Sequence, residues 1–435
     1  MVGVVREEKR EADREQRRVV ILGLEHPRAI AAISMLGERR VPVVGVDSQP
    51  SRRASASRFL KQTYRVSSNE AEALAFLVGL GERGGGVLMP TSAEQVIFVA
   101  ENAEVLGRHF LLTVPPMDIL APLLDLKSCY ELAGECGLRT PNVFVAHTEA
   151  ELQAAVAGLD FGKHAYLLRT PPGTVPADRS TGRYTIAAGG SAEAVLANCR
   201  EIYSRLGDYP TIAEAVPPAA NQCIGVFLIV GTNHEAVSVN CLRRFTPGPA
   251  ARSGGFVHPY DLGATAFCES IRDDEAVAAA RRFARHARYF GPISVEFLRD
   301  PRDGGLVFIK ADTHFIREMS LTRSVGSNPP FALYRAVTGG PHLDTGGDRE
   351  GVGWLWLTNY LDTLWRQRSN PPVLRELLRL PRRMARVRAL AYWNPKDSFP
   401  FLFDCGLWVK GRLLQLLRGA WSWTWRGLRG PSSRR

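Results

Sequence analysis

The 435-residue sequence has no run of about 18 apolar residues, the length that a helix needs to span a bilayer. Its first 17 residues carry charges of both signs and contain no apolar stretch of the kind that a secretory signal requires. We interpret residues 1–17 as a flexible charged arm. These absences together predict a cytoplasmic protein without a spanning helix.

Motifs for zinc and nucleophile chemistry are also missing. The seven cysteines never fall at CxxC spacing, and the nine histidines show no HxxxH spacing of the kind found in zinc sites. No Ser-His-Asp or Cys-His arrangement can be argued from the sequence. The pattern indicates reduced, mostly buried thiols, and it disfavours a disulfide scaffold, a zinc enzyme and a cysteine nucleophile.

The net charge of +11 is concentrated at one end of the chain. Residues 366–435 hold 16 Lys and Arg against three Asp and Glu, and all eight tryptophans follow residue 350. Over about residues 400–430, leucines and tryptophans lie among arginines, which is typical of a helix on an anionic membrane. A helix packed on the core with a disordered basic end is the alternative. We predict peripheral contact with the inner face of a membrane and, without a recognised module, no specific nucleic acid.

Strand and helix patterns alternate along the first part of the chain. Short apolar runs rich in β-branched residues, at 18–24 and 41–47, enclose a helical pattern at 27–39, and the same order repeats over 86–114. This β-α-β pattern predicts a Rossmann-like α/β domain over residues 18–115. No glycine fingerprint follows the first strand, so we expect no dinucleotide site there.

Four later segments match, in order, the motifs of one enzyme superfamily. They are DLKSCYELAGECGLRTP from Asp125, YLLRTP from Tyr166, TIAEAVPP from Thr211 and ISVEFLRDPRDGGLVFIKADTHF from Ile293. The last match is the longest, and it includes a hairpin turn, DPRDGG, between two apolar strands. The sequence resembles the ATP-grasp superfamily, in particular the carboxylate–amine ligases near D-aspartate ligase and carbamoyl-phosphate synthase.

The resemblance implies an architecture and an activity. It implies a two-lobed ATP-grasp domain over residues 116–340, with lobes at about 116–210 and 211–340, and a basic, tryptophan-rich, α-rich extension over 341–435. It implies ATP and Mg²⁺ as cofactors, and ligation of a small carboxylate to an amine through an acyl phosphate. Such ligases often pair, so a homodimer is also expected.

The resemblance assigns residues to the nucleotide. The family's phosphate-binding lysines correspond to Lys127, in the first motif, and to Arg169, at the end of the second. The hinge that cups the adenine corresponds to Ala213, Glu214 and Val216. ATP is therefore expected between the two lobes.

Other assignments concern the reaction itself. The metal ligands implied are Glu296 and Asp312 on the hairpin, because Mg²⁺ prefers carboxylate oxygens. Three cations are implied to act on the substrate carboxylate, the acyl phosphate or the transition state, since phosphoryl transfer depends mainly on position and charge. These cations are Arg243, Lys310 and Arg317.

The hairpin departs from the family pattern at three positions. Lys310 stands where the family has a glutamate ligand, Asp312 where it has asparagine, and His314 where it has arginine. A protonated lysine cannot ligate Mg²⁺. Either Lys310 replaces a metal ion electrostatically, or the chain is a degenerate ATP-grasp protein that binds nucleotide or acts as a membrane-associated accessory or scaffold. An ion pair between Glu296 and Lys310 across the hairpin is the purely structural alternative.

Overall fold

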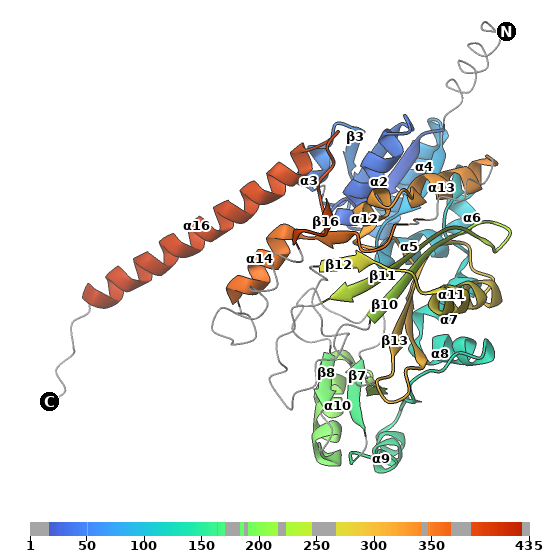
Figure 1. Cartoon of the computed structure of the whole chain (residues 1–435), viewed down its shortest axis with the longest axis vertical. Helices are drawn as coiled ribbons and strands as arrows, with labels where there is room; N and C mark the ends of the chain where they lie inside the picture. Colours follow the sequence, from blue (N-terminus) through green and yellow to red (C-terminus); the bar gives the residue numbers. More distant parts are fainter. Residues whose placement is uncertain are drawn as a thin grey trace, which may run out of the picture.

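The computed structural model shows an α/β protein built around three sheets (Figure 1). The residues it describes are 17–49, 51–162, 164–169, 183–186, 190–215, 223–245, 267–340, 347, 349–366 and 384–428. The N-terminal arm predicted for residues 1–17 lies outside these ranges except for its last residue.

The N-terminal domain is a parallel five-stranded sheet in the order β3-β2-β1-β4-β5, with helices in the connections. Its central strand, VVIL, is completely buried, which explains why its sequence is continuously apolar instead of alternating. The predicted Rossmann-like domain is thereby observed. Its elements are β1 (Val19–Leu22), α2 (Pro27–Gly37), β2 (Val43–Asp47), α3 (Arg52–Ser55), β3 (Leu60–Arg65), α4 (Glu70–Glu82), β4 (Gly86–Pro90), α5 (Ala93–Glu101), α6 (Ala103–Leu106) and β5 (Phe110–Leu112).

Two details of this domain differ from the sequence prediction. The edge strand β3, LKQTYR, was not predicted, because its mostly polar residues are only partly buried. The helical pattern expected over 93–106 divides at Asn102, which ends α5 and begins α6. Both differences arise where local sequence signals are weak, and neither changes the order of the sheet.

A small lobe follows, formed by a four-stranded sheet in the order β6-β9-β7-β8. Helix α8 begins at Asp125, whose side chain accepts a hydrogen bond from the backbone N–H of Ser128 at 2.8 Å. In Figure 1 the strands β7 and β8, with α9 and α10, lie at the opposite end of the molecule from the N-terminal sheet. The elements of this part are α7 (Met117–Leu124), α8 (Leu126–Glu135), β6 (Val143–Phe144), α9 (Glu149–Ala157), β7 (Ala165–Arg169), β8 (Arg183–Ile186), α10 (Ala192–Leu206) and β9 (Thr211–Ala215).

The large lobe is a seven-stranded sheet in the order β14-β13-β10-β11-β12-β15-β16. The predicted hairpin is observed as the antiparallel pair β13 and β14, joined by the DPRDGG turn. Helices α2, α12 and α13 pack between this sheet and the N-terminal sheet, so the two share one apolar core. The elements are β10 (Cys223–Val230), β11 (Ala236–Phe245), β12 (Phe267–Ser270), α11 (Asp274–His286), β13 (Gly291–Arg299), β14 (Leu306–Asp312), α12 (Met319–Ser324), α13 (Pro329–Thr338), β15 (Gly353–Leu355), α14 (Leu357–Arg366), β16 (Val387–Leu390) and α16 (Phe399–Leu428).

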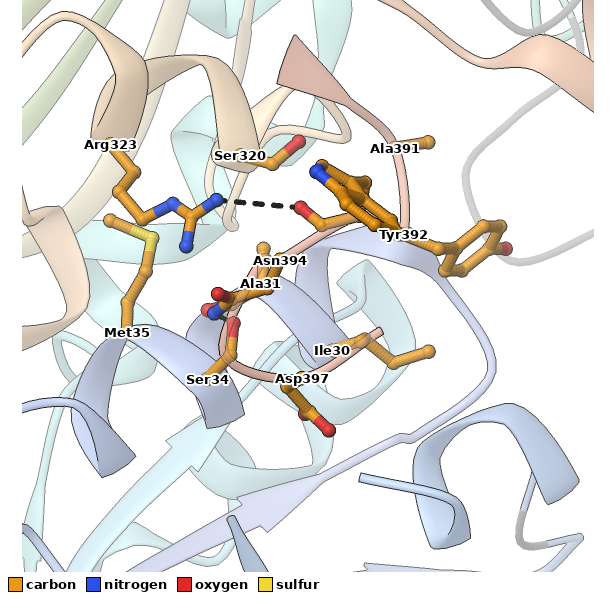
Figure 2. Close-up of a pocket in the computed structure, with 11 residues that line it drawn as sticks. Ile30, Ala31, Ser34, Met35, Ser320, Arg323, Ala391, Tyr392, Asn394 and Asp397 are labelled. Carbon is orange, nitrogen blue, oxygen red and sulfur yellow. Dashed lines mark hydrogen bonds between the residues drawn. The ribbon is translucent and has the colours of Figure 1, made fainter. Parts of the chain in front are cut away.

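The C-terminal extension is joined to the rest of the fold more closely than the sequence predicts. Strands β15 and β16 belong to the seven-stranded sheet, so the boundary expected at residue 340 does not separate two units. Beyond β16 the chain runs along the N-terminal domain, where Asn394 donates to Glu38 at 2.7 Å and Asp397 accepts from the backbone of Arg58 at 3.1 Å. Figure 2 shows the small pocket between α2 and this segment, where Arg323 donates to the carbonyl of Trp393 at 3.5 Å.

Candidate functional site

The hairpin brings the three predicted residues Glu296, Lys310 and Asp312 together. Glu296 on β13 lies opposite Lys310 on β14, and Asp312 follows two residues later on the same strand. Residues two apart on a strand point to the same face, so the three side chains meet on one side of the sheet. The ammonium of Lys310 lies 2.5 Å from Asp312 Oδ2 and 3.5 Å from Glu296 Oε1. The ion pair considered from sequence is therefore present.

A second cation, Arg244, reaches Glu296 from β11 and also holds a further carboxylate, Glu318. It forms an ion pair with Glu296 through Nη1, and its Nε lies 3.1 Å from Oε1 of Glu318. The intervening strand β10 leaves room because it carries Gly225, where an added Cβ would lie 3.0 Å from the guanidinium. The glycine is thus what allows Arg244 to cross the strand. We call Arg244, Glu296, Lys310, Asp312 and Glu318 the hairpin cluster.

Burial and charge pairing compete within the hairpin cluster, and pairing wins. Burial lowers the pKa of Lys310, but Asp312 and Glu296 more than offset this and raise it above its usual value. Burial raises the pKa of Asp312, and the Lys310 ammonium reverses the shift and holds it well below its usual range. The same holds for Glu318, where the Arg244 guanidinium outweighs burial and lowers the pKa. These groups are therefore charged at neutral pH.

This arrangement does not fit Mg²⁺ at the predicted pair of ligands. Magnesium requires several oxygen ligands around an unobstructed position. Here the Lys310 ammonium already lies within contact of both Asp312 and Glu296, and Arg244 takes the same oxygen of Glu296. Among the described residues, no group of three or more His, Cys, Asp or Glu side chains is arranged to hold a metal ion. The cluster supplies positive charge where the resemblance implied a cation site.

The N-terminal domain contributes a further arginine next to the hairpin. Arg28 on α2 is only 5% exposed, and its Nη1 donates to the carbonyl of Phe315 at 3.1 Å and lies 3.1 Å from Nδ1 of His314. Its Nε has no hydrogen-bond partner among the described residues. Burial, and then the charge of Arg317, lower the pKa of Arg28 to about 10. Arg28 and Arg317 are close enough to repel each other, and the carboxylates of Asp312, Glu318 and Glu94 offset part of this repulsion at Arg28.

Replacing His314 with glutamine is expected to flatten the dependence of stability on pH in the acid range. Burial, followed by the Arg28 charge, lowers the pKa of His314 from 6.5 to about 4. Between these two pH values His314 binds a proton in the unfolded chain but stays neutral in the folded chain. The free energy of unfolding of the wild type therefore falls as the pH drops from 6.5 to 4, by up to roughly 3 kcal/mol. Urea unfolding at several pH values measures the slope.

A matched control for this measurement is His286→Gln. His286 lies on the surface of α11 with 42% of its side chain exposed, and it pairs only with the exposed Glu135. The control should keep the wild-type slope. A His314→Gln protein with an unchanged slope would show that His314 titrates normally in the folded state.

Of the predicted nucleotide residues, Arg169, Ala213 and Glu214 lie in the small lobe, whereas Lys127 is on α8, which packs against β14 and α11 of the large lobe. Arg169 ends β7, and its backbone pairs with β8 and β9. Ala213 is buried on β9, and the neighbouring Glu214 is held by His164 at 2.6 Å and by Asn142 at 2.8 Å. Val216 lies outside the described residues. The hinge carboxylate thus has a fixed orientation before any ligand binds.

Two other predicted residues are themselves exposed, although the partner of Arg243 is buried. Lys127, at the start of α8, is 61% exposed and lies 4.0 Å from Glu131. Arg243 on β11 is 41% exposed and lies 3.6 Å from Glu269. Arg243 points away from the hairpin cluster because successive strand residues face opposite sides. Of the adjacent arginines, Arg244 is the one that faces Glu296, and strand alternation was the signal that could have identified it.

Sequence reasoning missed Arg28, Arg244 and Glu318. Arg244 could have been identified in principle, because alternation along β11 places it on the same face of the sheet as the charged residues of the hairpin. Arg28 was not, because its contact with His314 joins positions 286 residues apart. Glu318 follows β14 in an irregular stretch, where no periodic pattern predicts its direction.

Comparison with known proteins identifies the fold. No protein-family model matches the chain, and no curated protein matches it by sequence. An ADP complex of N5-carboxyaminoimidazole ribonucleotide synthetase matches 81% of this chain and 85% of its own, with a TM-score of 0.61 and 13% identity. Biotin carboxylase from Campylobacter jejuni, in a β,γ-ATP complex, matches 76% of this chain and 72% of its own, with a TM-score of 0.57 and 14% identity.

A third solved structure is similar to this chain to about the same degree. The biotin carboxylase domain of Hydrogenobacter thermophilus 2-oxoglutarate carboxylase, bound to MgADP, ADP and bicarbonate, matches 78% of this chain and 74% of its own, with a TM-score of 0.55 and 14% identity. The likeness shows that this chain has the ATP-grasp fold, as the sequence motifs predict.

Proposed function

We propose that this ATP-grasp chain binds ATP between its small and large lobes and uses it to join a carboxylate to an amine. The observation that carries the proposal is the hairpin cluster, a charged group set into the sheet of a fold shared with ATP-dependent ligases. Charged side chains are rarely placed in such a sheet without a task or a partner. The hairpin cluster contains five charged side chains, including the cations Lys310 and Arg244.

The nucleotide would be held mainly by the small lobe. Lys127 and Arg169 are the proposed phosphate-binding residues, and Ala213, Glu214 and Val216 are the proposed adenine hinge. Glu214 is already oriented by His164 and Asn142, so it can meet the ribose or the base without losing side-chain freedom on binding. Lys127 would have to leave its weak, exposed contact with Glu131, which costs little.

The chemistry would proceed in two displacements. A carboxylate oxygen attacks the γ-phosphorus of ATP and ADP leaves, giving an acyl phosphate. The amine nitrogen then attacks the acyl carbon, phosphate leaves, and the nitrogen loses a proton. Both steps concentrate negative charge on phosphoryl oxygens, and Lys310 would neutralise part of it. No step of this mechanism uses Mg²⁺ bound at Glu296 and Asp312, because the arrangement of these two residues does not fit that ion.

The acid substrate would be received by arginines. Arg317 is partly buried, has no ion pair with a described carboxylate, and lies near the buried Arg28. An incoming carboxylate would relieve the repulsion between the two guanidinium groups and could accept paired hydrogen bonds. Arg243 stays a prediction for the same role, from the opposite face of β11.

A second candidate function is supported by one distance. The 2.5 Å contact between Lys310 and Asp312 is a complete ion pair, which stabilises the fold whether or not catalysis occurs. In this second candidate function the chain binds nucleotide but releases no phosphate from it. The two candidates agree on ATP binding and differ on phosphate release.

Calorimetry of ATP binding, with Mg²⁺ and with EDTA, tests the proposal. We expect binding in both conditions, with dissociation constants within about tenfold of each other, because Lys310 and Arg244 supply charge that a metal would otherwise supply. Glu214→Ala should weaken both, while Glu104→Ala, on the exposed surface of α6, should change neither. Absence of binding in both conditions would contradict an ATP-grasp role altogether.

Phosphate release separates the two candidates. The wild-type protein is incubated with ATP and with a panel of amino acids, each offered as acid and as amine. Release that depends on one acid and one amine together supports the ligase. Binding of ATP without release for any pair supports the nucleotide-binding protein.

A further inference from the structure

The helix α16 is unlike every other described element, because much of it extends away from the body. It runs for 30 residues, from Phe399 to Leu428, and Figure 1 shows it leaving the N-terminal domain near α3 and projecting past α14. No helix in the described part of the chain is long and apolar enough to cross a membrane, and this one is no exception. Its length must serve some other contact.

One side of α16 is fixed to the body. Asp404 accepts from Arg53 on α3 at 2.7 Å and from Thr358 at 2.6 Å, and Trp408 donates to Asp362 on α14 at 3.2 Å. Arg412 forms an ion pair with Asp362 as well. These anchors recur every four residues, so they mark a single face of the helix.

The opposite side of α16 is apolar and uncovered. Leu402, Val409 and Leu413, spaced at helical intervals on one face, are 56%, 48% and 55% exposed. Of the ten exposed large hydrophobic residues of the described chain, six lie between 399 and 414. Scattered exposed leucines need no explanation, whereas such a concentration on one helix indicates a contact surface.

The charge of α16 indicates which kind of contact this is. The helix contains four cations in sequence, Lys410, Arg412, Arg418 and Arg426, and its single acid, Asp404, is buried against the body. The exposed part of the helix therefore presents no carboxylate of its own. Apolar residues beside cations complement a lipid surface of negative charge, with acyl chains below and phosphate groups at the level of the cations.

A second copy of this chain fits the same surface poorly. Two α16 helices packed by their apolar faces would bring their lysines and arginines together, with no exposed carboxylate on either to pair with them. Nucleic acid would satisfy the cations but would leave the leucines in water. Of these three occupants, an anionic lipid surface is the one that satisfies both.

We propose that α16 lies on an anionic membrane surface, with Leu402, Val409 and Leu413 inserted among the lipids and with the exposed Lys410 at the headgroups. Because Asp404 and Trp408 fix the other face of the helix to α3 and α14, the helix holds the whole body at the membrane in one orientation. This surface is separate from the hairpin cluster, and the proposal does not depend on the ligase activity.

Co-sedimentation of the full chain with lipid vesicles tests the proposal. We expect at least tenfold stronger partitioning onto vesicles of phosphatidylglycerol and phosphatidylcholine than onto phosphatidylcholine alone. Raising the ionic strength from about 0.1 M to about 1 M should weaken binding, because it screens the headgroup charge. Equal binding to both vesicle types, or binding to neither, would overturn the proposal.

Two double variants identify the surface. Leu402→Glu with Leu413→Glu should reduce partitioning at least tenfold. Val105→Glu with Tyr203→Glu changes two comparably exposed apolar residues elsewhere, 38% and 43% exposed, and should leave it unchanged. Thermal unfolding checks that both proteins are folded. Equal losses in both variants would show that added negative charge, and not α16, explains the effect.

Light scattering after size-exclusion chromatography tests the remaining alternative, in which a second copy of the chain covers the apolar face of α16. We expect the molar mass of the protein to be the same for the wild type and for Leu402→Glu with Leu413→Glu. A dimer that the double substitution dissociates would overturn the lipid proposal and assign the helix to a second copy of the chain.

Discussion

Replacing Arg244 with methionine is expected to lower the free energy of unfolding by about 3–5 kcal/mol, the typical cost of breaking a buried ion pair. The side chain of Arg244 is 9% exposed and holds two carboxylates, Glu296 at 13% and Glu318 at 3%. Without the guanidinium, Glu318 would be a buried charge left with only the weaker effect of Arg317. Methionine fills a similar volume, so the loss would report charge and not a cavity.

Urea unfolding of purified proteins measures this loss, and the adjacent arginine provides the control. Arg243→Met removes a cation that is 41% exposed and 3.6 Å from its partner, so it should cost less than about 1 kcal/mol. A similar loss for both variants would mean that the hairpin cluster is not held together by Arg244.

The pH dependence of the same experiment tests the cause. Burial raises the pKa of Glu318 and the Arg244 charge lowers it below its usual value, so in the wild type this pair stabilises the fold above about pH 4.3 and loses its effect at lower pH. In Arg244→Met the two largest effects that lower the pKa of Glu318 are lost, burial outweighs the smaller ones that remain, the pKa of Glu318 rises, and the acid takes up a proton on folding. The deficit of the variant should therefore shrink as the pH falls from about 7 to about 4.

The sequence was sufficient for those parts of the fold whose signals are local. The hairpin was predictable because the DPRDGG turn lies between two apolar strands, although its register shifts at a bulge between Glu296 and Phe297 that the turn does not specify. The buried strands of the N-terminal domain were predictable for the same reason. Strand β15, only three residues long, is too short to show a period, and its place in the sheet is set by contact with β12 and β16.

The candidate site, like the fold, could be predicted only in part from the sequence. Glu296, Lys310 and Asp312 lie within 17 residues of each other, so their place on one hairpin could be predicted, whereas their meeting depends on the bulge that sets Lys310 opposite Glu296. What those residues do together could not be predicted, because Arg244 and Glu318 come from other elements and determine which carboxylate is already neutralised. The metal expectation rested on residue types. The geometry of the cations around them is what disagrees with it.

Replacing Lys310 with glutamate is expected to create a requirement for Mg²⁺ that the wild type lacks. The change removes the ammonium 2.5 Å from Asp312 and places a third carboxylate beside Glu296 and Asp312, which gives the oxygen-rich set that Mg²⁺ prefers. Without a divalent cation these acids repel each other, so the variant should be several kcal/mol less stable, and Mg²⁺ at millimolar concentration should restore much of the loss. The ratio of the ATP dissociation constants in EDTA and in Mg²⁺ should rise at least about a hundredfold, the usual worth of one positioned charge.

Lys310→Met separates the loss of the cation from the gain of a ligand. It removes the same charge but adds no oxygen, so it should be destabilised without being rescued by Mg²⁺. Rescue of both variants would mean that Glu296 and Asp312 alone can hold the ion once Lys310 is gone, and that the lysine blocks a metal site that is otherwise complete. Rescue of neither would mean that the hairpin cluster holds no latent metal site. The lysine would then be a structural partner of Asp312, and ATP binding in this chain would depend on its arginines.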